Sequence, residues 1–179
     1  MDAASATGRI AQLRPPAPQL VLLGLTVVLI VAGSRLAGFR EWLFGLSLRQ
    51  IVALHLSRFI GIYFLVLNRQ GQLPWEFAVP GGLGDIAVAA GAAWLVFGAG
   101  TLLPSTRWLR VWNLLGLFDI WFVVVTAARL AFAKPDSMSA LLRLPLSLRP
   151  TFLVPLIIAS HVLLIVRLGQ TREPAKTLR

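Results

Sequence analysis

Five apolar blocks dominate this sequence of 179 residues. Each block has about twenty residues, the length that a helix needs to cross the hydrocarbon core of a bilayer. The blocks lack the alternation of period two that is typical of a membrane β-barrel. Only 13% of the residues are charged, about half the fraction found in a typical soluble domain. The sequence therefore predicts an all-α integral membrane protein, a bundle of about five transmembrane helices.

These helices are expected to form one domain, residues 19–168, between a disordered, proline-rich tail at 1–18 and a basic tail at 169–179. The alternative for the first apolar block is a cleaved signal peptide, because arginines precede it. The glycine- and proline-rich segment 71–84 is interpreted as a loop that ends at the mouth of the third helix. The expected helices lie at about residues 20–38, 48–68, 85–103, 108–131 and 151–168.

The net charge of +10 indicates how the chain is anchored rather than a nucleic-acid partner. All but one of the 17 basic residues lie near predicted helix ends, where they contact anionic lipids and bias the orientation. Nucleic-acid binding would need a soluble module with a basic face, and the sequence contains none. The expected location is multi-pass in a bacterial inner membrane. The N-terminus is expected outside and the C-terminus inside, because the 71–84 segment with few charges resembles an external loop.

Two charged residues lie near the middle of predicted helices. Arg58 is about ten residues into the second helix and Asp119 about eleven into the fourth, counted from the same side, so both lie roughly 15 Å deep. A buried arginine without a partner is costly. We therefore expect Arg58 and Asp119 to pair.

Four further polar residues complete the candidate site. His55 and His161 fall at matching depths on the second and fifth helices, and Asn113 lies slightly shallower on the fourth. Asp85 is expected at the opposite mouth, although Gly-Leu-Gly-Asp85-Ile resembles the later Gly-Leu-Phe-Asp119-Ile. The two histidines are expected to face one another.

Three functions remain open from the sequence. The first is binding or transport of a small solute or of protons at the intramembrane site formed by Arg58, Asp119, His55, His161, Asn113 and Asp85. The second is an electron-transfer subunit that holds haem b between its two histidines. The third is a structural subunit of a membrane complex.

No catalytic motif is present, so an enzyme is not expected, and no metal site is predicted. The absence of cysteine also removes thiolate chemistry. A chain this short is expected to enclose a transport path only as a homo-oligomer or within a membrane complex.

Overall fold

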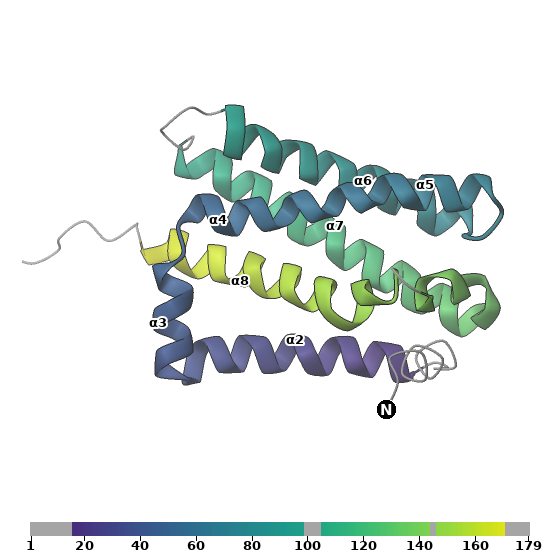
Figure 1. The fold of residues 1–179 in the computed structure, drawn as a ribbon, viewed down its shortest axis with the longest axis horizontal. Helices are drawn as coiled ribbons and strands as arrows, with labels where there is room; N and C mark the ends of the chain where they lie inside the picture. The colour runs from purple at the N-terminus through teal and green to yellow at the C-terminus, as the bar shows by residue number, and fades with distance from the viewer. Residues whose placement is uncertain (1–15, 99–104, 144–145, 171–179) are drawn as a thin grey trace, which may run out of the picture.

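The computed structural model describes residues 16–98, 105–143 and 146–170, and this part of the chain is helical without any strand. Five of its helices are long and apolar enough to cross a membrane, as judged by length and composition. They lie side by side along one axis (Figure 1). The first described helix starts at one end of this bundle and the last ends at the other end.

The first long helix, α2 (Ala17–Arg35), is the least buried of the five. Only Leu22 and Thr26 are buried in it, while most of its leucines and valines are exposed. It begins inside the segment that was expected to be disordered, and it ends three residues earlier than predicted. A short helix, α3 (Ala37–Gly45), then runs across the end of the bundle (Figure 1).

The second long element joins three helical pieces in one line, namely α4 (Leu48–Ala53), the 3₁₀ segment η1 (Leu54–Ile60) and α5 (Gly61–Arg69). Its start is fixed by a capping box. The Ser47 hydroxyl accepts a hydrogen bond from the Gln50 backbone N–H, and the Gln50 side chain accepts one from the Ser47 N–H.

The third long element differs most from the prediction. Its helix α6 (Trp75–Ala93) starts ten residues before the predicted 85, and it continues as the π-helical turn η2 (Trp94–Gly98). Most of the predicted 71–84 loop is therefore helix, with Pro80 inside it. The final residues of the predicted third helix, 99–103, lie outside the described residues.

The fourth long helix, α7 (Thr106–Ala133), extends the prediction by about half a turn at each end. A 3₁₀ segment, η3 (Pro135–Leu142), follows and packs against it. The last element begins with the π-helical turn η4 (Arg149–Leu153) and continues as α8 (Val154–Gln170).

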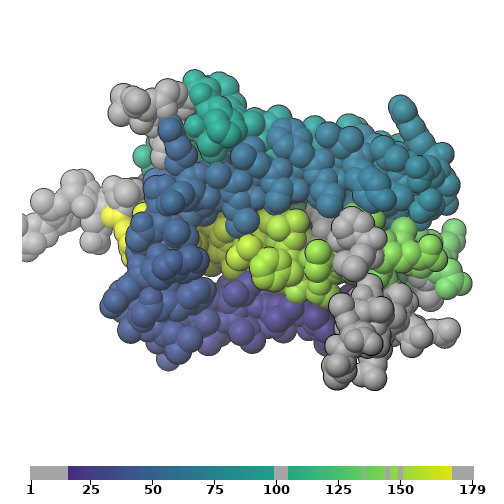
Figure 2. Space-filling view, viewed as in Figure 1, coloured from purple at the N-terminus to yellow at the C-terminus, as the bar shows by residue number. Residues whose placement is uncertain are grey.

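The helices contact one another in a simple order. Helix α6 packs against α5, η1 and α7, while α8 packs against α7 and α2. Figure 2 shows α8 between α2 and the α4–α5 element on one face. At the end near α3, Arg167 donates a hydrogen bond to the Leu46 carbonyl, and its guanidinium lies 5.9 Å from the Phe44 ring centroid. The end of α8 is thereby tied to the turn before α4.

Apolar clusters fill the bundle toward both ends. One contains Phe64, Phe77 and Val123, and another contains Val52 and Leu95. The buried polar residues His55, Arg58, Asp85 and Asn113 lie between these two clusters along their helices.

Candidate functional site

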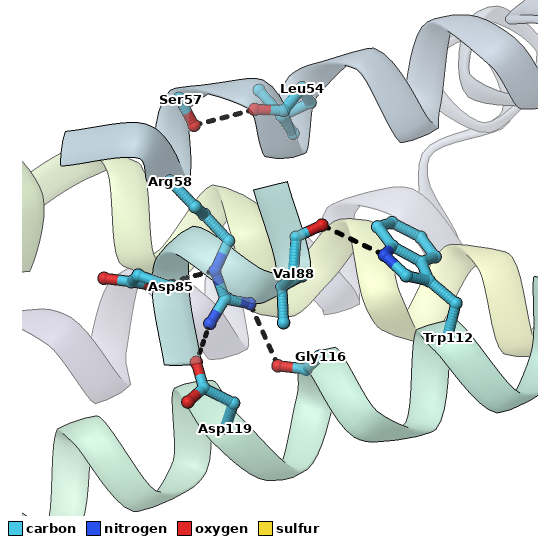
Figure 3. Close-up of polar contacts among 8 residues, drawn as sticks. All are labelled: Leu54, Ser57, Arg58, Asp85, Val88, Trp112, Gly116 and Asp119. Atoms are coloured by element: carbon cyan, nitrogen blue, oxygen red, sulfur yellow. Dashed lines mark hydrogen bonds and ion pairs between the residues drawn. The ribbon is translucent and has the colours of Figure 1, made fainter. Parts of the chain in front are cut away.

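Arg58 is the centre of the buried polar cluster, and it has no exposed surface. Its Nε donates to Asp85 Oδ1 over 2.8 Å, and its Nη1 donates to the Gly116 carbonyl over 3.0 Å. Its Nη2 forms an ion pair with Asp119 Oδ2. Figure 3 shows the guanidinium held between these three groups. The predicted contact between Arg58 and Asp119 is therefore present.

The sequence predicted Asp85 at the mouth of the bundle, and this prediction is wrong. Asp85 lies eleven positions into α6 and is fully buried against Arg58. The reason is the early start of α6, which moves this residue by almost three turns along the bundle axis. The two Gly-Leu-x-Asp-Ile segments thus present their carboxylates to the same guanidinium.

The formal charges of this cluster do not balance. Arg58 contributes one positive charge, whereas Asp85 and Asp119 contribute two negative charges, so the sum is −1 when both carboxylates are ionised. The Asp119 side chain is 15% exposed, while Arg58 and Asp85 are completely buried. Asp119 is therefore the only one of these three side chains that reaches the surface of the described structure.

Glycines allow the helices to approach closely enough for these contacts. A Cβ at Gly61 would lie 2.8 Å from Asp85 Cβ, and a Cβ at Gly82 would lie 2.8 Å from the Gly61 carbonyl oxygen. A Cβ at Gly84 would overlap the Asp119 carboxylate. Small residues permit such backbone contacts between apolar helices, and here they bring both aspartates to Arg58.

The 3₁₀ geometry of η1 aligns two of the predicted site residues. Residues i and i+3 eclipse one another in a 3₁₀ helix, which has three residues per turn. His55 and Arg58 are three positions apart in this segment, and both are fully buried. They therefore project from the same line along the helix.

His55 and His161 face one another, as predicted, with ring centroids 4.4 Å apart. The hydrogen bonds of His161 fix its tautomer. Asn113 Nδ2 donates to the His161 carbonyl, so Asn113 Oδ1 is an acceptor for the Nδ1–H of the same histidine at 2.8 Å. His161 Nε2 then carries a lone pair.

The tautomer of His55 follows in the same way. The Ser160 hydroxyl donates to the Ile157 carbonyl over 2.7 Å and lies 3.2 Å from His55 Nε2. Because the shorter bond uses the only hydroxyl proton, Ser160 Oγ accepts from the His55 Nε2–H. His55 Nδ1 then carries a lone pair. Among the described residues, His55 Nδ1 and His161 Nε2 are both buried without a hydrogen-bond partner.

Two residues that sequence reasoning did not single out shape this pair. Trp112 lies 5.0 Å from the His55 ring and 6.1 Å from the His161 ring between centroids, and its indole N–H donates to the Val88 carbonyl. A Cβ at Gly116 would lie 2.7 Å from His161 Cε1. The sequence carries a weak signal for both, because each shares a helix face with Asn113 or Asp119.

The histidine geometry does not fit a haem iron. An iron bound by both rings would hold each nitrogen about 2 Å away, as imidazole does with zinc, and so would separate the centroids by about 6 Å. The observed 4.4 Å leaves no room for a porphyrin between the rings. Within the described part of the chain, no group of three or more His, Cys, Asp or Glu side chains could hold a metal ion.

Comparison with known proteins gives a family without a described activity. No curated protein and no solved structure matches this chain. One family model, described as "Domain of unknown function (DUF8737)", matches residues 15–169. This range includes four of the five long helices in full, the fifth up to its last residue but one, and every residue of the polar cluster. The chain belongs to this family of unknown function, DUF8737.

Proposed function

We propose that this chain is an integral membrane protein that binds and transports a small monovalent cation, the proton included, at the Arg58 cluster. Membrane insertion is supported by the surface of the bundle. Large apolar side chains are exposed on all five long helices, among them Leu20, Leu83, Phe118 and Ile165. Such a surface is unfavourable in water and favourable in contact with lipid tails.

The observation that carries the proposal is the formal charge of −1 in the cluster of Arg58, Asp85 and Asp119. An uncompensated charge is costly inside a bilayer. One monovalent cation, or one proton on a carboxylate, would bring the sum to zero. Asp119 supports a route of exchange, because its side chain is partly exposed while those of Arg58 and Asp85 are completely buried.

The charge distribution at the two ends supports an orientation with the C-terminus inside. The end with α3 holds six arginines in the described residues, and Glu41 is the only acidic residue described there. The other end has fewer basic and more acidic side chains, since Glu76 and Asp136 lie near it. Basic residues favour the cytoplasmic side and its anionic lipids. The arginines are Arg35, Arg40, Arg49, Arg107, Arg110 and Arg167.

The test is cation flux into liposomes that contain the purified protein and an internal pH dye. A potassium diffusion potential should drive proton entry faster than in empty liposomes. Asp119→Asn makes the cluster formally neutral and should reduce this flux at least tenfold. The matched control is Asp136→Asn, the same change at an exposed residue of η3, which should leave the flux unchanged.

The structural-subunit alternative has an observation in its favour, because Arg58 ties η1 to both α6 and α7. Wild-type liposomes that conduct no faster than empty ones would leave the cluster with this role alone. Equal fluxes in Asp119→Asn and Asp136→Asn would likewise contradict transport through the cluster.

A further inference from the structure

We propose that the histidine pair is the part of this site that selects the cation, and that the cation carries N–H donors, as ammonium and small protonated amines do. This inference rests on the proposed function for the transport step. It starts from His55 Nδ1 and His161 Nε2, two fully buried lone pairs without a hydrogen-bond partner in the described residues. Buried polar atoms rarely lack a partner.

The ligand must donate hydrogen bonds, because both open atoms are acceptors. The only N–H of each ring is already used, by Ser160 Oγ for His55 and by Asn113 Oδ1 for His161. An anion or a carbonyl group therefore has nothing to bind here. Sodium and potassium ions prefer oxygen ligands to imidazole nitrogen. An N–H donor can satisfy such a lone pair.

A cationic ligand follows from the proposed function, and the histidine pair adjoins the cluster whose formal charge is −1. His55 lies one 3₁₀ turn from Arg58. Gly116 connects the two parts, since its carbonyl accepts from Arg58 and its Cα approaches the His161 ring. Arg58, the charged group that acts on both histidines, is itself paired with Asp85 and Asp119.

Trp112 adds a third favourable feature. Its ring lies close to both imidazoles, and an aromatic face attracts a cation. Its indole N–H donates to the Val88 carbonyl, so it does not occupy either lone pair. The site thus offers two nitrogen acceptors and an aromatic ring beside a net negative charge, a combination that suits an ammonium group.

The experiment compares ammonium with potassium, which has the same charge and a similar size but no hydrogen-bond donor. Thermal unfolding of the full chain in detergent is followed at constant pH and ionic strength with ammonium, methylammonium or potassium chloride. Ammonium should raise the melting temperature by about 3–5 °C for each tenfold excess over its dissociation constant. Potassium should have no such effect, and methylammonium reports how large a donor is accepted.

Nitrogen NMR of histidine-labelled protein tests the site without any substitution. The chain has only two histidines, so four ring signals are expected. Ammonium should shift the signals of His55 Nδ1 and His161 Nε2 and leave their partners nearly unchanged. Equal effects of ammonium and potassium would overturn the inference. Signals that respond to acid but not to ammonium would also overturn it, and would leave the proton as the cation.

Variants then locate the binding. His55→Phe and His161→Phe keep an aromatic ring without its lone pair, and each should weaken the ammonium effect at least tenfold. The matched control is Ser57→Ala in the same segment, because the Ser57 hydroxyl donates to the Leu54 carbonyl of that segment (Figure 3). Loss of the ammonium effect in the control alone would contradict the assignment.

The two proposals can fail separately. Proton flux without any ammonium effect would remove the selectivity of the histidine pair and leave the proposed function intact. Ammonium binding by NMR without any flux in liposomes would remove transport and leave the binding site.

Discussion

The charge sum of the Arg58 cluster predicts an unusual pattern of stabilities when its members are neutralised. Arg58→Met removes the charge and the three donors that hold Asp85, Asp119 and the Gly116 carbonyl. Breaking a buried ion pair from one side costs about 3–5 kcal/mol, which is a hundredfold to several thousandfold in the folding equilibrium at about 1.4 kcal/mol for each factor of ten. Arg58→Lys keeps the charge but loses the planar guanidinium that binds several acceptors at once, so its loss of stability should be intermediate.

The aspartates should behave differently from the arginine. Asp85→Asn or Asp119→Asn alone leaves one positive and one negative charge, and the amide oxygen can still accept from Arg58. Each single change should therefore cost less than about 1 kcal/mol. The double change leaves Arg58 without any counter-charge and should cost as much as Arg58→Met, about 3–5 kcal/mol. The two substitutions are thus expected to be strongly non-additive.

The assay is unfolding by sodium dodecyl sulfate in mixed micelles, followed by tryptophan fluorescence or circular dichroism. Asp136→Asn serves as the control for the substitution itself, because this carboxylate is exposed. If the losses of the two aspartate variants simply add, the carboxylates do not share one positive charge. If Asp119→Asn alone is as damaging as Arg58→Met, Asp119 is the sole counter-ion and the excess charge does not exist.

Three further changes test the packing around the site in the same unfolding assay. Gly116→Ala places a methyl group against the histidine ring of α8 and should cost about 1–3 kcal/mol while also weakening the ammonium effect. Gly61→Ala would overlap the backbone of α6 and should cost at least as much, whereas Gly24→Ala, whose methyl group meets no atom of the described residues within 4 Å, should be neutral or slightly stabilising. Ser47→Ala removes the cap that pairs with Gln50 and should cost about 1 kcal/mol, with faster amide exchange in the first turn of α4 as its local signature.

Helix depth was enough to predict two contacts of the site from the sequence. Arg58 and Asp119 meet because the second and fourth helices cross the bundle as expected, so residue counts from one side convert directly into depth. The same argument brings His55 opposite His161. Their hydrogen-bond partners could not be predicted in this way, because depth gives no rotation about the helix axis. Ser160 and Trp112 were missed for this reason.

The 3₁₀ segment, like the rotation of the helices about their axes, could not be predicted from the sequence. In a regular α-helix, His55 and Arg58 would differ in direction by about 60°, whereas 3₁₀ geometry places them in line. Nothing in Leu54–Ile60 forbids an α-helix, since the segment contains neither proline nor glycine. The two buried side chains of this segment contact α6, α7 and α8, and those contacts cannot be read from the local sequence.

Asp85 shows why depth counting failed for the third helix. Pro80, Gly81, Gly82 and Gly84 were interpreted as a loop because such residues weaken helices in water. In the bilayer that we propose for this chain, there is no water to bond an unwound backbone, which favours a helix through such a stretch. The same glycines are required where they stand, because Gly82 meets the Gly61 carbonyl and Gly84 meets the Asp119 carboxylate. An error of ten residues in the helix start is about 15 Å in depth, the whole distance from the mouth to Arg58. The Arg58–Asp85 contact, which makes the cluster formally negative, was therefore not predicted. The glycines that make this contact sterically feasible are the residues that had been interpreted as a loop.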